Sequence, residues 1–170
     1  NGLKGLLSAD ASALRQLDGI GPAKCAELLV IRELQRRCAL ESLTDLPVLN
    51  QADKVREYCL AHIGHLPVEH CLALFLDNQL RLICAEEISR GTVNQASVYP
   101  REILRAALRH HSCAIILAHN HPSGAAYPSA ADIRLTRHIR QALALVDIRV
   151  LVHIIVTPSQ TVSMAERGDL

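Results

Sequence analysis

The spacing of apolar residues divides the chain into a helical first part and a mixed second part. Up to about residue 38, apolar residues recur every three or four positions, which is the spacing of amphipathic helices. A loop-like stretch follows, and the helical spacing then returns between residues 50 and 64. We therefore expect a helical module over residues 1–38, a linker over 39–49 and a second domain over 50–170.

From about residue 67 onward, extended runs are mixed with helical ones. The first two extended runs are separated by a turn at Asp77-Asn78-Gln79, which is typical of a β-hairpin. Strands mixed with helices in this way predict an α/β fold, in which helices pack on a sheet. The runs expected to form strands are residues 69–76, 80–88, 91–99, 113–118, 148–156 and 161–164. The helices expected among them are residues 100–110 and 128–145.

Composition says little about the fold, but it restricts the kinds of partner that the chain can bind. The formal net charge is +1, so the chain carries no basic coat for nucleic acid. With one Phe, three Tyr and no Trp, aromatic platforms for single strands are not expected either. No apolar run approaches the ~18 residues that span a membrane, and the N-terminus lacks the layout of a signal peptide. The six cysteines form no C-x-x-C pair, and several lie in apolar runs, which indicates buried thiols in a reducing compartment.

The candidate chemistry is concentrated just after the apolar run at 113–118. His119 and His121 are two residues apart, so in extended backbone their side chains point to the same face. Ser129 and Asp132 fit an S-x-x-D helix cap, which aims the carboxylate out of the helix start. Two imidazoles and one carboxylate are the ligands of a catalytic zinc site with an open fourth position. Nine histidines and a common capping pattern leave a chance arrangement equally open.

A zinc-activated water also needs a proton carrier that is not a ligand. Glu69 stands at the start of the first expected strand, and Glu86 and Glu87 lie in the second. Residue types alone do not choose among the three.

The spacing H-x-H-x7-S-x2-D resembles the signature of the JAMM/MPN+ metalloproteases. The blocks HNHPSG, LALFLDNQLRLICAEE, SRGTVNQASVYPREILRAALRHH and LVDIRVLVHIIV resemble the RadC family of bacteria, from about residue 67 to the C-terminus. The resemblance implies a curved mixed sheet flanked by helices, of the JAMM/MPN (cytidine deaminase-like) kind. It also implies one zinc ion per chain, bound by His119, His121 and Asp132.

The resemblance assigns two further roles and reveals one departure. Glu69 matches, by order and context, the glutamate that is the general acid/base of JAMM enzymes, and Ser129 matches the serine that stabilises the oxyanion. Ser129 can serve as a helix cap at the same time. RadC-like chains usually carry Asp-His where this chain has Val152-His153. If that Asp orients a metal ligand, Val152 predicts weaker metal binding, and His153 is expected to be a packed strand residue rather than a ligand.

The segment LRQLDGIGPAKCA, residues 14–26, resembles a helix-hairpin-helix motif. Its turn, with Gly19 and Gly21, would expose backbone N–H groups at a helix N-terminus, and Lys24 adds a positive charge. These features favour contact with the DNA backbone without sequence preference. The same turn equally suits a plain connection between helices that contacts protein.

Two main functions are consistent with these residues. The first is a zinc-dependent hydrolase of amide or isopeptide bonds in the bacterial cytoplasm, acting on a protein or peptide substrate. The second is a DNA-associated factor of repair or recombination without hydrolytic activity, in which the metal is structural. Metal-dependent cleavage of phosphodiester bonds is a third possibility, but it suits a single zinc site less well than a two-metal site.

Overall fold

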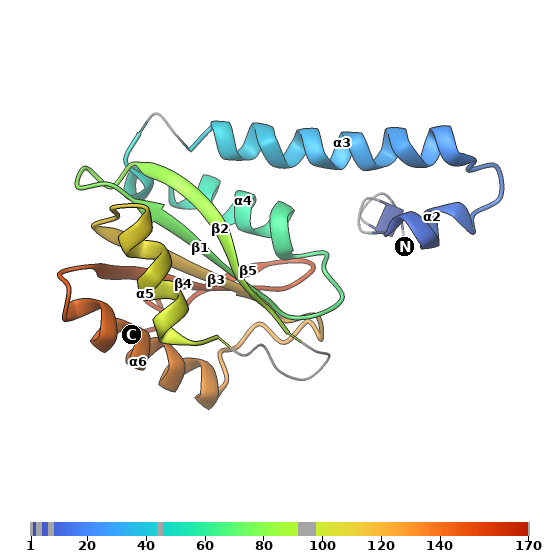
Figure 1. Ribbon diagram of the computed structural model, residues 1–170. Helices are drawn as coiled ribbons and strands as arrows, with labels where there is room; N and C mark the ends of the chain where they lie inside the picture. The colour runs from blue at the N-terminus through green and yellow to red at the C-terminus, as the bar shows by residue number, and fades with distance from the viewer. Residues whose placement is uncertain (1, 3–4, 7–8, 44–45, 92–97, 170) are drawn as a thin grey trace.

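The computed structural model describes the whole chain except residues 1, 3–4, 7–8, 44–45, 92–97 and 170. Its centre is one mixed sheet with the strand order β2-β1-β3-β4-β5 (Figure 1). Strands β3 and β4 pair in parallel, and the other neighbours pair antiparallel. The strands are β1 (His70–Leu76), β2 (Leu82–Arg90), β3 (Ala114–Asn120), β4 (Arg149–Val156) and β5 (Thr161–Ser163). Most of the extended piece expected at 91–99 lies outside the described residues.

Helices cover both faces of this sheet, which confirms the predicted α/β class. Helix α4 (Ala52–Ile63) lies on one face, and α5 (Pro100–Arg109) and α6 (Ala130–Ala144) lie on the other (Figure 1). Because both faces are covered, every residue of the central strands β1 and β3 is buried, and their sequences are nearly continuous apolar runs. The helix expected from residue 50 begins at Ala52, after the 3-10 turn η1 (Val48–Gln51).

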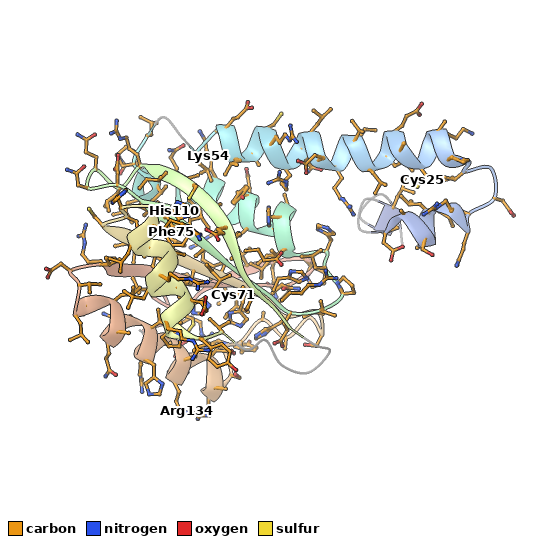
Figure 2. The ribbon with its side chains drawn as sticks, viewed as in Figure 1. Cys25, Lys54, Cys71, Phe75, His110 and Arg134 are labelled. Atoms are coloured by element: carbon orange, nitrogen blue, oxygen red, sulfur yellow. The ribbon has the colours of Figure 1, made fainter. Side chains whose placement is uncertain are left out.

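Successive side chains of β1 point to opposite faces and contribute to two separate cores. Leu72 and Leu74 pack in the core under α4, whereas Ala73 and Phe75 pack with α5 and α6. The ring of Phe75 also contacts the imidazole of His110, with 4.9 Å between centroids (Figure 2). This alternation decides which residues of each strand can reach a site on the α5/α6 face.

The N-terminal part forms a helical arm. Helix α2 (Ala11–Arg15) is capped by Asp10, and α3 (Pro22–Glu41) continues to Glu41 rather than ending near residue 38. Figure 1 shows α3 passing over α4 and extending beyond the sheet, with α2 packed against its far end. Among the described residues, no helix combines the length and the apolar character that crossing a membrane requires.

Candidate metal centre

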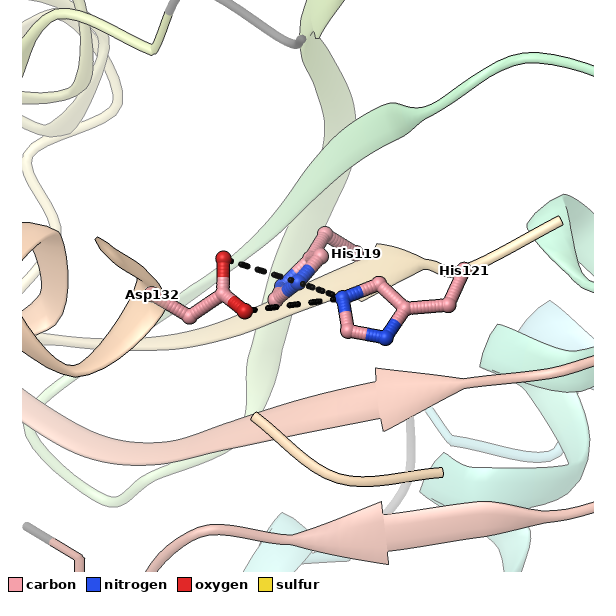
Figure 3. A group of neighbouring side chains, drawn as sticks. All are labelled: His119, His121 and Asp132. Atoms are coloured by element: carbon pink, nitrogen blue, oxygen red, sulfur yellow. Dashed lines mark hydrogen bonds and ion pairs between the residues drawn. The ribbon is translucent and has the colours of Figure 1, made fainter. Parts of the chain in front are cut away.

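Three side chains from two elements converge at the end of β3. His119 lies in β3, His121 directly follows the strand, and Asp132 lies in the first turn of α6. One ligand atom from each lies within 4.8 Å of the others, and the side chains point toward one another (Figure 3). Within the described part of the chain, this is the one group of His, Cys, Asp or Glu side chains arranged to share an ion.

The local sequence explains why the carboxylate points at the histidines. Ser129 is the N-cap of α6, and its hydroxyl accepts a hydrogen bond from the backbone N–H of Asp132 at 3.1 Å. In return, the backbone N–H of Ser129 donates to Oδ2 of Asp132 at 2.6 Å. This reciprocal capping box is the S-x-x-D pattern found in the sequence, and it fixes the carboxylate at the N-terminus of the helix.

The potential ligand atoms face a common point. The Nε2 atom of His119 lies 3.4 Å from Oδ1 of Asp132, and Nε2 of His121 lies 3.5 Å from Oδ2. The two Nε2 atoms are 2.8 Å apart. The side chains are largely withdrawn from solvent, with 11% of each imidazole and 18% of the carboxylate exposed. Two imidazole nitrogens and a carboxylate are a donor set that zinc accepts in catalytic sites.

The outer nitrogen of each imidazole is occupied, which leaves Nε2 for a metal. Nδ1 of His121 lies 2.7 Å from the carbonyl oxygen of Ala125. A carbonyl can only accept, so Nδ1 carries the proton and Nε2 keeps its lone pair. Nδ1 of His119 lies 2.7 Å from Nε2 of His153. Histidines that bind metals are typically held by such outer hydrogen bonds, so these residues fit a metal ion.

The electrostatics of the group favour a positive charge between its members. Although burial opposes the effect, the hydrogen bonds that His119 and His121 donate in their doubly protonated, imidazolium form hold the pKa of the Asp132 carboxyl well below its usual range. The hydrogen bond with Asp132 raises the pKa of His121, and the carboxylate of Glu69 acts in the same direction. A cation placed among these groups would therefore meet a fully ionised carboxylate.

The structure separates the three glutamates that the sequence left as candidates. Glu69 lines a small cavity of about 40 Å³ together with Cys71, His119 and Asp132. That volume is enough for a water molecule. Glu86, in β2, instead binds Arg109 and His110 at the end of α5. Glu87 binds His70 at 2.9 Å. Of the three, only Glu69 therefore lies beside His119 and Asp132.

Comparison with known proteins decides the family. Residues 49–169 match the RadC-like JAB domain. The chain is 54% identical over 169 residues to a UPF0758 protein of Bordetella parapertussis, covering 99% of this chain and 75% of the relative. UPF0758 proteins of Paracidovorax citrulli and Albidiferax ferrireducens are 50% and 46% identical, over 98% and 100% of this chain and 70% and 73% of theirs. The chain belongs to the RadC family. Its fold and its group of two histidines and one aspartate are consistent with a JAB-type metal site.

One residue of the site was not identified from the sequence of this RadC-family chain. Asn120, between the two histidines, is 1% exposed. Its Oδ1 accepts from the backbone N–H of His70 at 2.6 Å, and its Nδ2 donates to the carbonyls of Leu66 and Val68 at 3.2 and 3.0 Å. Asn120 therefore holds the backbone on both sides of Glu69. An Asn that is buried at the end of an apolar strand, inside H-N-H, was the available signal.

The departure from the RadC pattern affects a different place than expected. Val152 packs in the core under α4, on the face of the sheet opposite the metal ligands. A side chain at position 152 therefore does not contact His119, His121 or Asp132, and weaker metal binding stays a prediction that this geometry does not support. His153, which was expected to be a packed strand residue, is 2% exposed, points to the site and contacts His119. A histidine in the otherwise apolar run LVHIIV was the signal for it.

The glycine turn of the N-terminal arm lies away from the metal centre (Figure 1). Gly19 has a positive φ of 78°, and Gly21 is the N-cap of α3 without a side-chain capping bond. Lys24 donates to the carbonyl of Gly19 at 3.0 Å, so its ammonium lies over the turn. In the described residues of the arm, a glycine turn thus joins α2 to α3, while the match to the RadC family begins at residue 49.

Proposed function

We propose that this RadC-family chain is a zinc-dependent hydrolase of amide or isopeptide bonds in a protein or peptide substrate. The observation that carries the proposal is the convergence of His119, His121 and Asp132 beside a small cavity that Glu69 lines. When bound there, zinc would supply a Lewis acid and lower the pKa of a coordinated water toward ~7.

The roles of the protein side chains follow from their positions. The Glu69 carboxylate would take a proton from the attacking water and deliver it to the leaving amine. Ser129 is exposed, and its oxygen already accepts from the Asp132 N–H, so the hydroxyl proton stays available for an oxyanion. Capping and oxyanion stabilisation are therefore compatible roles for one serine.

The cellular setting is part of the same proposal. The relatives that match this chain are bacterial, and its six cysteines are all free thiols. Free thiols suit a reducing compartment, so we place the protein in the bacterial cytoplasm.

The test begins with metal content. We expect the chain, purified without chelator and reconstituted with zinc, to hold about one zinc ion, and His119→Ala and Asp132→Ala to hold much less. A wild-type chain that holds no zinc under these conditions would contradict the proposal.

The second part of the test separates zinc binding from catalysis. Glu69→Gln should keep its zinc but lose hydrolysis of a bacterial peptide library, measured as newly formed amino termini. Glu87→Gln is the matched control, because Glu87 pairs with His70 away from the cavity and should retain both properties. Equal hydrolysis by wild type and Glu69→Gln would remove Glu69 from the mechanism.

A second candidate function is contact with the DNA backbone through the N-terminal turn. The supporting observation is the Lys24 ammonium held over the Gly19 carbonyl at the start of α3. Lys24→Gln should weaken binding to a duplex and reduce its salt dependence, whereas Lys54→Gln on α4 should change little. Fluorescence anisotropy at two salt concentrations measures both, and equal effects of the two variants would refute a specific role of the turn.

A further inference from the structure

A buried chain of hydrogen bonds connects two of the metal ligands behind the site. Nδ1 of His119 lies 2.7 Å from Nε2 of His153, and Nδ1 of His153 lies 2.6 Å from the hydroxyl of Thr136. The Thr136 hydroxyl also donates to the backbone carbonyl of Asp132 at 2.7 Å. Thr136 and His153 are 0% and 2% exposed, so solvent does not substitute for any of these contacts.

The chemistry of the groups fixes the direction of each bond. The Asp132 carbonyl can only accept, so the single proton of the Thr136 hydroxyl is donated to it. The Thr136 oxygen must then accept from Nδ1–H of His153. A neutral imidazole has one N–H, so Nε2 of His153 carries a lone pair and accepts from Nδ1–H of His119. The proton of His119 is thereby held on Nδ1, and its Nε2 is left as a lone pair aimed at the metal position.

We propose that His153 and Thr136 are positioning residues for the metal centre, which set the tautomer and ring orientation of His119 and tie it to the backbone of Asp132. This inference rests on the proposed zinc site. Neither residue is a ligand. They act through His119, and outer partners of this kind typically change metal affinity by about 10- to 100-fold when removed.

Thr136 and His153 come from different elements, so their hydrogen bonds connect separate parts of the fold. Thr136 is one helical turn after Asp132 on α6, so it lies on the same face of that helix. His153 belongs to β4, the neighbour of β3 in the sheet. The contact therefore ties α6, β4 and β3 together at the ligands, and a purely apolar packing of the same volume would leave the His119 tautomer undetermined.

Matched substitutions separate this role from packing. Thr136→Val keeps the shape and removes the hydroxyl, while Thr136→Ser keeps the hydroxyl. His153→Leu removes the acceptor for His119, while His153→Gln can restore one. Zinc affinity of the full chain is measured by competition with a chromophoric chelator at constant pH. We expect His153→Leu to lose about 10- to 100-fold, Thr136→Val to weaken in the same direction, and Thr136→Ser to stay near wild type.

A second readout needs no zinc. Imidazole ¹⁵N chemical shifts of the metal-free wild-type chain should show the His119 proton on Nδ1, and Thr136→Val should shift the population toward Nε2–H. If wild type binds zinc while folded His153→Leu and Thr136→Val bind it equally well, the inference is overturned. A His119 proton on Nε2 in wild type overturns it as well. If the wild-type chain binds no zinc, the proposed hydrolase fails, while a His119 proton found on Nδ1 would still support the hydrogen-bond chain.

Discussion

Replacement of Asn120 by alanine removes the three hydrogen bonds that hold the backbone around Glu69. The bonds run to the N–H of His70 and the carbonyls of Leu66 and Val68, at 2.6, 3.2 and 3.0 Å. His70 is 4% exposed, so water cannot readily replace the lost acceptor of its N–H. A buried donor left without a partner costs about 1–3 kcal/mol.

The two carbonyls contribute less, because Leu66 and Val68 are only partly buried and water can reach them. Allowing about 0.5–1 kcal/mol for each, the free energy of unfolding should fall by about 2–5 kcal/mol in total. For a chain of this length, a loss of about 3 kcal/mol corresponds to a drop in melting temperature of roughly 6–12 °C.

The assay is urea unfolding of the metal-free chain, followed by far-UV circular dichroism. Asn78→Ala is the matched control, because Asn78 lies exposed in the turn between β1 and β2 and should change stability by less than about 0.5 kcal/mol. Hydrogen exchange should also show lost protection at the His70 amide. If Asn120→Ala unfolds within about 0.5 kcal/mol of wild type, Asn120 does not hold this segment.

Three further predictions concern pH, backbone crowding and metal binding. Burial lowers the pKa of His62 from 6.5 to about 4, so the unfolded chain takes up this proton first as the pH falls. The free energy of unfolding should then fall as the pH drops below about 6.5. Between pH 7.5 and 5, this fall should be smaller in His62→Leu than in wild type by up to about 2 kcal/mol, measured by urea unfolding. A Cβ on Gly64 would lie 2.6 Å from the carbonyl oxygen of Leu60, so Gly64→Ala should cost about 1–3 kcal/mol in thermal unfolding, whereas Gly21→Ala, in open space, should not. The hydrogen bond with Asp132 raises the pKa of His121, so zinc must displace a proton from this imidazole at low pH. Zinc affinity should therefore fall by about tenfold for each unit that the pH is lowered, for each imidazole proton displaced. A chelator competition that gives equal affinities at pH 8 and 6 would contradict this.

The parts of the molecule that obey local rules could be predicted from the sequence. The sequence located all five strands of the sheet to within a few residues. Burial on both faces demands continuous apolar sequence in the central strands β1 and β3, and the turn at residues 77–79 separated β2 from β1. The approach of Asp132 to the histidines was also foreseeable. The capping box with Ser129 orients the carboxylate within four residues, and the strand before His119 sets the two imidazoles on one side.

The supporting residues could not be found in this way, because their roles depend on pairings between distant segments. Asn120 acts on residues 50 to 54 positions earlier in the chain, and the contact exists only because β1 and β3 are neighbours. Residue types alone likewise did not choose Glu69 over Glu86 and Glu87. The resemblance to JAMM enzymes did, and in the structure Arg109, His110 and His70 hold the other two glutamates away from the site.

One extra residue in β4 determines which faces of the sheet Val152 and His153 point to. In the pairing of β3 with β4, Ile115 stands opposite Val150 and Ile116 opposite Val152, so Leu151 is an additional residue at an irregularity. Before the irregularity, Ile115 and Val150 share the α5/α6 core; after it, Leu117 shares that face with His153. Without the extra residue, Val152 would stand opposite Leu117 and face the metal ligands, and His153 would turn toward α4. Regular alternation therefore misassigns every residue of β4 beyond this point, and the histidine reaches His119 because the strand breaks its own period.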